Sequence, residues 1–497
     1  MNTVESARLF PNLEAWDPAP LRKALRKGGF HKEALETLGL PEHWLRSEVP
    51  RAALLSHAPA GSAVDSLIRL FTLGDAIDGE DALHALGESI HGLLDLGFLT
   101  AGEGRVRSLY QILPVAHGWV ACDLLRRQGE DADDYVMGVG PSSVLLRSLT
   151  PPVDGRVLEL ACGIGWLSGQ LVRAGLPVVA TDLNGRALEL GRFSARLAGV
   201  EGIDFRQGDG FSTVAGESFD LIVANPPYVQ SPGGNMVFKE SPEGDPICAR
   251  LLRELPAYLA PGGIAVVLLN WCHRTDDDWP DTPLSWVDPV GTRRWIFQSD
   301  CSSPADYAWK WISSDQRFRN EHAAADEIRR WLAHYRAHDV RRVSGGFMVI
   351  QKCEPGGEWT RTESRAAEGI HARAGDELLR IVGNETWLAG GHDLLETRFH
   401  VPDGAKAEVV MALEDGWARR TIRLTSPSRL SYDGQVDENI LRLLELCRAG
   451  RAPAEMVREI RAKPEFSAMT DLPDRIRNLV RELVSHGMLV PAGTVRD

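Results

Sequence analysis

In the middle of the chain, short apolar runs alternate with helical patterns, and no other feature limits the fold so strongly. Residues 156–161 (RVLELA) form the first run, and a helical pattern follows it as far as Gly175. Later runs cover 177–182, 219–224 and 263–269. Because the crossover between parallel strands places a helix on the sheet, this alternation predicts helices on both faces. We expect an α/β fold with a doubly wound, mostly parallel sheet.

The length of the chain predicts more than one domain. A chain of 497 residues exceeds the roughly 250–300 residues that one core usually supports. Residues 1–125 suggest helices followed by a short hairpin, 126–355 hold the α/β pattern, and 356–497 begin with β-like runs and end in helices. We expect three domains with these bounds. The outer two are either winged-helix-like or plain helical packing domains.

Composition excludes several classes of protein. The 55 Lys and Arg against 69 Asp and Glu give a net charge of −14, which disfavours a broad nucleic-acid surface. The seven cysteines contain no C-x-x-C pair, so we expect neither a disulfide framework nor a metal site. The apolar runs are too short to cross a bilayer, and the first residues do not form a leader peptide. These features predict a cytoplasmic protein without membrane segments.

A glycine-bearing turn follows the first predicted strand. Cys162–Gly165 join that strand to a helix, and a bare backbone at a helix N-terminus can cradle an electron-rich ligand. Glu159 lies inside the strand, and Asp182 ends the next one, where a carboxylate can accept both hydroxyls of a ribose. Ser168 occupies the place of the third glycine of a dinucleotide motif, which disfavours a pyrophosphate site. The turn therefore predicts a site for a nucleoside.

The tetrapeptide Asn225-Pro226-Pro227-Tyr228 directly follows the apolar run 219–224. Two prolines cannot donate ladder hydrogen bonds, so the strand must end at the carboxyl edge, where open α/β sheets bind ligands. The Asn225 side-chain oxygen and the Pro226 carbonyl are two neighbouring acceptors that suit a planar NH2 group. Tyr228 offers a flat face for stacking. The alternative interpretation is a turn that merely ends a strand.

These motifs together resemble the class I S-adenosylmethionine-dependent methyltransferases, in the branch that carries the (D/N)-P-P-(Y/F) motif. That branch includes the release-factor glutamine, ribosomal-RNA guanine-N2 and adenine-N6 methyltransferases. The resemblance is specific over 133–232, and the overall plan is similar to that of a group of bacterial three-part methyltransferases. It implies a Rossmann-like sheet of seven strands, S-adenosylmethionine as cofactor, an EC 2.1.1 transferase activity and no metal.

The resemblance also implies roles for individual residues. Glu159 corresponds to the acid of the first motif, and Ala161 replaces its first glycine. Asp182 corresponds to the ribose-binding acid and Asp209 to the adenine-contacting acid, while 135–142 resembles the loop that closes over the cofactor. The implied cofactor-binding residues are Glu159, Ala161, Cys162, Gly163, Gly165, Asp182, Leu183, Asp209, Gly210, Asn225 and Gly138. The implied catalytic residues are Asn225, Pro226 and Tyr228.

Three functions are compatible with these residues. Hydrogen bonds from an amine to Asn225 and Pro226 would make its nitrogen pyramidal and aim the lone pair at a methyl group. The first hypothesis is therefore N-methylation of a glutamine amide or of an exocyclic base amine. The second is methylation of a small metabolite, and the third is a catalytically silent, cofactor-binding regulator. The oligomeric state is not indicated.

Other candidate residues have plainer explanations. His334 and His338 are spaced for a metal, but the neighbouring arginines favour a solvated basic helix. Residues 317–342 hold seven arginines and form the one stretch suited to phosphate. The tryptophans that could line an acceptor pocket are Trp271, Trp279 and Trp286. Those expected to serve packing are Trp295, Trp309 and Trp311.

Overall fold

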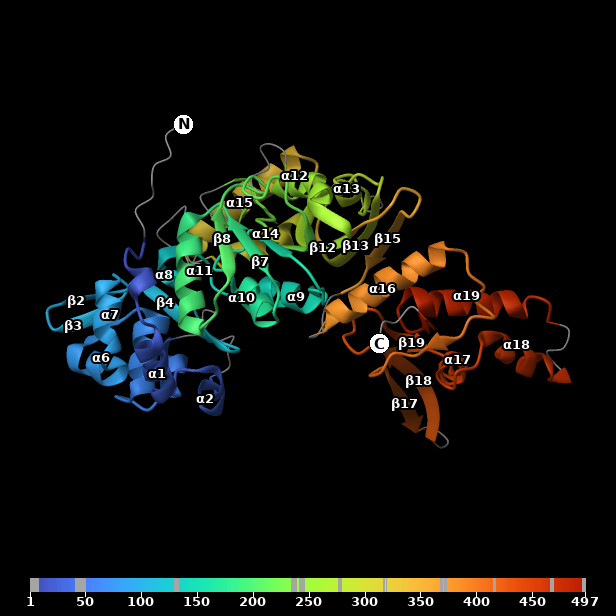
Figure 1. Ribbon diagram of the computed structural model, residues 1–497, viewed down its shortest axis with the longest axis horizontal. Coiled ribbons are helices and arrows are strands. Elements are labelled where there is room, and N and C mark those ends of the chain that lie inside the picture. The colour runs from blue at the N-terminus through green and yellow to red at the C-terminus, as the bar shows by residue number, and fades with distance from the viewer. Residues whose placement is uncertain are drawn as a thin grey trace. The chain divides into compact units, whose positions relative to one another are not determined.

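The structure is a computed structural model that divides into two compact units (Figure 1). It describes residues 9–40, 51–128, 134–233, 239–240, 246–275, 279–315, 318, 320–366, 370, 373–413, 417–464 and 469–493. The first unit combines 1–144, 154–288 and 296–352, and the second combines 145–153, 289–295 and 353–497. The division differs from the expected three parts because 1–144 share a unit with the α/β segment.

The main sheet has the strand order β15-β13-β14-β12-β9-β6-β7-β8. Pairing is parallel from β12 through β9, β6 and β7 to β8, and antiparallel between β12 and β14, which confirms a mostly parallel sheet. The sheet has eight strands where seven were expected, because β15 is added beside β13 at its edge. The strands are β6 (Val157–Leu160), β7 (Val178–Asp182), β8 (Ile203–Gln207), β9 (Phe219–Ala224), β12 (Leu259–His273), β13 (Thr292–Ser302), β14 (Arg342–Lys352) and β15 (Trp359–Ser364).

Helices cover both faces of this sheet. Val179 and Ala180 are neighbours on β7 and point to opposite faces. Val179 shares a buried cluster with Leu251 of α12, and Ala180 shares another with Leu188 of α11. The remaining elements of this segment are α9 (Pro141–Leu149), α10 (Trp166–Arg173), α11 (Gly185–Ala198), β10 (Val229–Gln230), β11 (Lys239–Glu240), α12 (Ile247–Glu254), η3 (Leu255–Tyr258), α13 (Asp281–Leu284), α14 (Pro304–Ile312) and α15 (Glu321–Ala337).

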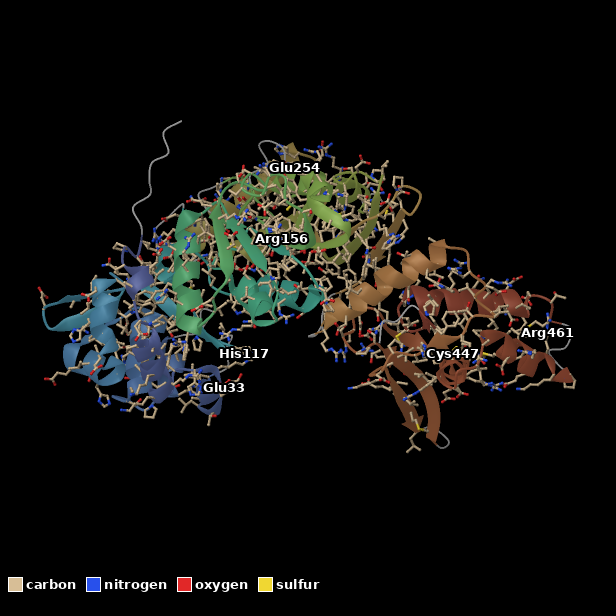
Figure 2. All side chains as sticks on the ribbon, viewed as in Figure 1. Glu33, His117, Arg156, Glu254, Cys447 and Arg461 are labelled. Atoms are coloured by element: carbon tan, nitrogen blue, oxygen red, sulfur yellow. The ribbon has the colours of Figure 1, made fainter. Side chains whose placement is uncertain are left out.

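The amino ends of β6 and β9 are fastened to each other, away from the carboxyl edge. The backbone N–H of Arg156, which Figure 2 labels, donates to Asp220 Oδ2 at 2.8 Å, and the Arg156 guanidinium pairs with Glu217 at 2.6 Å. The same guanidinium lies over the ring of Phe219, 5.0 Å from its centroid. These contacts fix the register with which both strands reach the carboxyl edge.

The N-terminal segment shares one continuous core with the α/β segment. Phe98 stacks on Phe193 of α11 with ring centroids 4.5 Å apart, and Phe10 lies 5.4 Å from the same ring. Its small sheet has the order β1-β3-β2, with two helices before a hairpin, and its assignment as a winged helix stays a prediction. The elements are η1 (Leu13–Ala15), α1 (Ala19–Lys27), α2 (Lys32–Thr37), α4 (Arg51–Ser56), α5 (Ala63–Leu67), η2 (Ile68–Leu73), β1 (Ala76–Asp78), α6 (Gly79–Leu86), α7 (Ser89–Asp95), β2 (Leu99–Gly102), β3 (Arg105–Ser108), β4 (Tyr110–Val115), β5 (Gly118–Asp123) and α8 (Leu125–Gln128).

In the part that the structure describes, the second unit combines a three-stranded antiparallel sheet, β17-β18-β19, with the helices α16, α17, α18 and α19. Cys447 lies in its helical core (Figure 2), and the seven cysteines, all of which the structure describes, form no disulfide. The elements are α16 (Ala374–Ala389), β16 (Phe399–His400), β17 (Lys406–Leu413), β18 (Trp417–Thr425), β19 (Asp433–Val436), α17 (Glu438–Arg448), α18 (Pro453–Arg461), α19 (Leu472–Ser485) and β20 (Val490–Pro491). Among the described residues, no helix is both long and apolar enough to span a bilayer.

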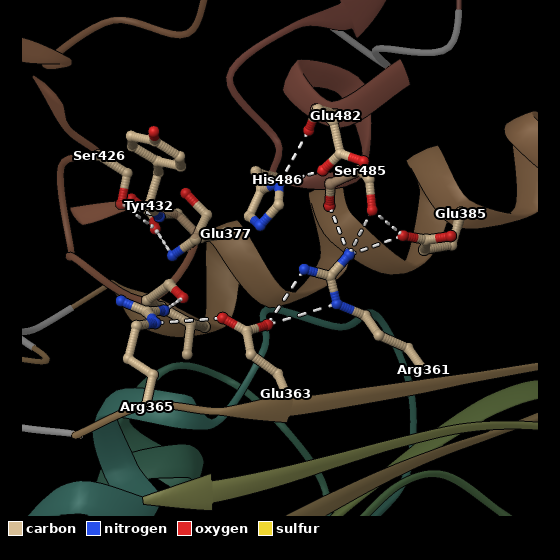
Figure 3. A network of polar contacts seen from close by, with 12 residues as sticks. Arg361, Glu363, Arg365, Glu377, Glu385, Ser426, Tyr432, Glu482, Ser485 and His486 are labelled. Carbon is tan, nitrogen blue, oxygen red and sulfur yellow. Dashed lines mark hydrogen bonds and ion pairs between the residues drawn. The ribbon is translucent and has the colours of Figure 1, made fainter. Parts of the chain in front are cut away.

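A network of charged side chains joins the elements of the second unit (Figure 3). Arg361 of β15 donates to Glu385 of α16 at 2.6 Å and to the Ser485 carbonyl of α19 at 2.7 Å. Glu377 of α16 is 2% exposed and accepts three hydrogen bonds from the loop that precedes β19. Buried charges are tolerated when they are paired and hydrogen-bonded in this way.

Candidate functional site

Three chain turns meet at the carboxyl edge of the sheet. In register, Leu160 of β6 pairs with Thr181 of β7 on one side and with Ala224 of β9 on the other. The glycine turn begins after Leu160, and the Asn-Pro-Pro-Tyr corner begins after Ala224. Because adjacent strands lie about 4.8 Å apart, both turns start side by side. The topology thus brings together segments that the sequence separates by about sixty residues.

The glycine turn adopts a backbone that its glycines make accessible. Gly163 and Gly165 have φ values of +55° and +62°, in the left-handed region. A Cβ atom at Gly165 would lie 2.6 Å from Phe205 Cε1, whereas one at Gly163 would meet no atom within 4 Å. Gly165 is therefore needed for packing. Gly163 leaves open space over the turn at the N-terminus of α10.

Ala161 also adopts a left-handed backbone, with φ +52°. This is the position where the resembling family has its first glycine. A left-handed conformation costs an L residue about 1–2 kcal/mol, so the substitution stores strain at the start of the turn.

Replacing Ala161 by glycine is expected to raise the free energy of unfolding by about 0.5–1 kcal/mol. The relief of left-handed strain exceeds the added chain entropy of glycine in the unfolded state. Urea denaturation followed by tryptophan fluorescence measures the change. A destabilised Ala161→Gly variant would show that this backbone is not strained.

Glu159 is a buried acid whose hydrogen bonds join β6 to the residues that follow the glycine turn. Its Oε2 accepts hydrogen bonds from the Ser168 backbone N–H at 2.7 Å and from the Ser168 hydroxyl. Burial raises the pKa of Glu159 to about 7, although both hydrogen bonds act in the opposite direction. These contacts join β6 to the first turn of α10. A direct contact of Glu159 or Cys162 with the cofactor stays a prediction.

Asp182 ends β7 beside the glycine turn, as its assigned role requires. Its two carboxylate oxygens accept the backbone N–H groups of Gly163 at 2.7 Å and of Asn184 at 2.8 Å. Burial raises the pKa of Asp182, and these two hydrogen bonds oppose the rise. Each oxygen keeps a further lone pair for a hydroxyl donor. Leu183, the next residue, is 63% exposed, so an apolar side chain stands open beside the acid.

Asp209 lies in the loop after β8 and forms a bidentate ion pair with Arg250 of α12. The Arg250 nitrogens donate to its two oxygens at 2.6 and 2.9 Å. The hydrogen bonds from Arg250 hold the pKa of the Asp209 carboxyl below its ordinary value. Gly210 follows with φ +54°. An adenine amine bound at Asp209 would therefore share this carboxylate with a guanidinium that sequence analysis did not identify.

The expected cofactor loop is anchored at its root by an ion pair. Asp123 of β5 accepts the Val136 backbone N–H at 2.7 Å and pairs with the Arg186 guanidinium of α11. The Asn184 side chain donates to the Asp134 carbonyl at 3.1 Å. At Gly138, a Cβ atom would approach Cys122 Sγ to 3.0 Å, so the loop lies close against the β4–β5 hairpin. The loop is therefore tied to the turn that carries Asp182.

The corner after β9 presents the polar groups that the sequence predicted. Asn225 is half-buried, and its Nδ2 donates to Ser142 Oγ at 3.1 Å. Because the oxygen and nitrogen of a carboxamide point in different directions, Oδ1 faces away from Ser142. The ring of Tyr228 lies edge-on to the ring of Trp311, with 6.5 Å between the two ring centroids. Burial raises the pKa of the Tyr228 hydroxyl, and a hydrogen bond with Ser142 partly offsets this rise.

The tryptophans singled out in the sequence differ in burial. Trp271 is 1% exposed inside the core, whereas Trp279 and Trp286 are partly buried against the same cluster, and their place at an acceptor pocket stays a prediction. Trp309, expected to pack, is 55% exposed, whereas Trp295 is buried as expected. Trp311 is the tryptophan that reaches the corner.

The arginine-rich helix α15 is largely neutralised by its own acids. Arg329 pairs with Asp326 and Arg330 with Glu327. His338 Nδ1 bonds the His334 carbonyl of the same helix at 2.9 Å. Within the described part of the chain, no three His, Cys, Asp or Glu side chains are grouped to hold a metal. The expected phosphate-facing stretch gains no support from this arrangement.

Two family models match separate parts of the chain. Residues 139–273 match the family described as the methyltransferase small domain, which covers the glycine turn and the corner. Residues 382–491 match a family described as a domain of unknown function.

Curated relatives match the same central segment. A ribosomal protein uL3 glutamine methyltransferase of Bradyrhizobium diazoefficiens is 30% identical over 188 residues, which are 34% of this chain and 57% of the relative. The "Putative protein N5-glutamine methyltransferase" of Methanocaldococcus jannaschii is 33% identical over 135 residues, 26% of this chain and 68% of the relative. The ribosomal RNA small subunit methyltransferase C of Chromohalobacter salexigens is 38% identical over 127 residues, 26% and 35% of the two chains. The chain thus spans about half the length of the curated relatives it matches.

Proposed function

The chain belongs to the S-adenosylmethionine-dependent N-methyltransferases of the (D/N)-P-P-(Y/F) branch, and we propose that it methylates a planar nitrogen of a macromolecule. The observation that carries this proposal is the pairing of Leu160 with Ala224, because it places the glycine turn and the Asn225 corner side by side. A nucleoside site and an amine site are therefore neighbours at one edge.

The residues at the glycine turn fit S-adenosylmethionine. Gly163 leaves open space over the turn, Asp182 offers carboxylate lone pairs to two ribose hydroxyls, and the exposed Leu183 offers an apolar surface to a base. When bound, this cofactor supplies an electrophilic methyl group on a positively charged sulfur. The loop around Gly138, held by Asp123, would cover the same site.

The corner residues act on the acceptor nitrogen. Asn225 Oδ1 and the Pro226 carbonyl accept hydrogen bonds from its two N–H groups. These bonds reduce the conjugation of the nitrogen and direct its lone pair outward. Tyr228 provides a face against which a planar amide or base can stack. Orienting a reactant in this way removes an entropic part of the barrier, and fixed dipoles stabilise the charge that develops on nitrogen. The mechanism requires no covalent intermediate.

A glutamine side-chain amide is the acceptor we favour. Two of the relatives described above are named glutamine methyltransferases, and the net charge of −14 opposes a large phosphate-binding surface. An exocyclic base amine is the second candidate, because a third relative is a ribosomal-RNA methyltransferase. We place the reaction in the cytoplasm, where free thiols such as those of this chain persist.

Methylation with isotope-labelled cofactor tests the proposal. Cell extract is incubated with the purified chain and separated into protein, nucleic acid and small molecules, and the protein fraction is hydrolysed and analysed for N5-methylglutamine. Label in that product supports the favoured acceptor, and label in a methylated base supports the second. Label confined to small molecules, or no transfer at all, would refute macromolecular N-methylation.

Replacing Asp182 by alanine is expected to weaken binding of S-adenosylmethionine by about 10- to 100-fold. The change removes hydrogen bonds to a charged acceptor, which contribute about 1.5–3 kcal/mol each. Titration calorimetry measures the affinity, and Asp204→Ala on neighbouring β8 serves as a control outside the turn. If Asp182→Ala and Asp204→Ala bind equally well, Asp182 is not the ribose-binding acid.

A further inference from the structure

Ser142 contacts a polar side chain of the corner. Its Oγ accepts a hydrogen bond from Asn225 Nδ2 at 3.1 Å. Ser142 lies in the first turn of α9, 83 positions away from Asn225 along the chain. The Ser142 hydroxyl also lowers the pKa of the Tyr228 hydroxyl, which burial raises. Ser142 therefore joins α9 to the side chain that would face the acceptor.

This contact anchors the Asn225 carboxamide in the observed orientation. A carboxamide carries two donor hydrogens on one side and an acceptor oxygen on the other, so a flipped side chain would present N–H groups to an amine. With Nδ2 at Ser142 Oγ, Oδ1 is available to the substrate. Without the Ser142 hydroxyl, the carboxamide loses this hydrogen bond and can turn, so the amine would meet a donor in part of the population.

We infer that Ser142 is a positioning residue for methyl transfer, which holds Asn225 in its accepting orientation. The inference rests on the proposed function of the corner. Ser142 also terminates the loop whose root is tied by Asp123 and Arg186 to the turn bearing Asp182. The loop assigned to the cofactor thus ends in a residue that orders the acceptor corner.

The test compares Ser142→Ala with Ser143→Ala, a matched change of the adjacent half-buried serine. Ser142→Ala is expected to lower kcat for methyl transfer about tenfold or more, since small misplacements of a reacting group are costly. The affinity for S-adenosylmethionine should stay near that of the unchanged chain. Ser142→Thr, which keeps the hydroxyl, should restore part of the rate, and Ser143→Ala should retain most of it.

Two further measurements separate positioning from a merely structural role. In the Asn225→Ala background, adding Ser142→Ala should cause no additional loss, because Ser142 acts through Asn225. In selectively labelled protein, the Asn225 side-chain amide signals, assigned by their absence in Asn225→Ala, should move in Ser142→Ala and stay in Ser143→Ala. This second readout needs no acceptor.

The outcomes are distinct. If the unchanged chain transfers no methyl group to any fraction, the proposed function fails, while the amide signals still test the contact. If the unchanged chain is active and Ser142→Ala matches Ser143→Ala in both rate and amide signals, the inference about Ser142 is overturned.

Discussion

Replacing Asn225 by alanine is expected to lower kcat for methyl transfer by about 10²–10³, the loss typical of removing one fixed polar group that stabilises a transition state. Asn225 directly follows β9, and in the proposed function its Oδ1 accepts a hydrogen bond from the substrate amine. Alanine keeps the backbone and Pro226 in place but offers no acceptor. Affinity for S-adenosylmethionine should change little, because Asp182, the proposed ribose-binding acid, lies at the end of β7 on the other side of β6.

The matched control is Asn225→Asp, which keeps an oxygen at the same position and corresponds to the other residue found in the resembling motif. It should retain more activity than Asn225→Ala, although the Nδ2 donor to Ser142 is lost. Single-turnover measurement with labelled cofactor compares the three chains at saturating acceptor. If Asn225→Ala turns over at the rate of the unchanged chain, the planar-nitrogen mechanism is wrong.

Local patterns predicted the central strands and the helical tail well. The runs 177–182 and 219–224 correspond to β7 and β9, and the helical end expected for 356–497 includes α18. These segments are read from side chains close in sequence, where burial repeats with a fixed period. The position of Asp182 at the end of β7 could be predicted for the same reason, because the apolar run shows where the strand ends.

Partners distant in the sequence could not be predicted in this way. Ser142 meets Asn225, Arg250 meets Asp209, and Asp123 meets Arg186, and each contact depends on how the strands are ordered. Arg250, Asp123 and Arg186 have no distinctive sequence pattern around them, and the patterns around Asn225 and Asp209 do not show which distant residue each one meets. The geometry of the site therefore contains restraints that appear only when the sheet is assembled.

The burial of Trp271, which the sequence suggested for an acceptor pocket, also depends on strand pairing. The apolar run ends at Leu269, yet β12 continues to His273 because it pairs with β14 as far as Arg342. The pairing of β12 with β9 ends at Val267, so the continued pairing with β14 is what extends β12 past its apolar segment. Trp271 is consequently a core residue of an extended strand rather than part of a loop at the edge.

Replacing Glu377 by alanine is expected to lower the free energy of unfolding of the second unit by about 3–5 kcal/mol, the cost of removing one partner from a buried charged network. The Glu377 carboxylate accepts hydrogen bonds from the Ser428 N–H at 2.7 Å, the Ser426 hydroxyl at 2.9 Å and the Ser431 N–H at 3.0 Å. A guanidinium nitrogen of Arg380 lies 3.7 Å from Glu377 Oε1. Alanine would leave these donors buried and without an acceptor.

Lowering the pH should weaken the stabilisation that the Glu377 carboxylate provides. Burial alone would raise the pKa of Glu377, but hydrogen bonds from Ser428 and Ser426 and the charge of Arg380 outweigh it and lower the pKa below 4.5. The stabilisation is therefore complete above the unfolded-state pKa and is lost as pH falls through the lower folded-state value. Urea midpoints for the second unit, measured at pH 7 and at about pH 3, should show the gap between the unchanged chain and Glu377→Gln narrowing at the lower pH. If the midpoints of the unchanged chain and Glu377→Gln differ equally at both pH values, the charge of Glu377 does not stabilise the fold. If the midpoint of Glu377→Ala equals that of the unchanged chain, the network has no stabilising role.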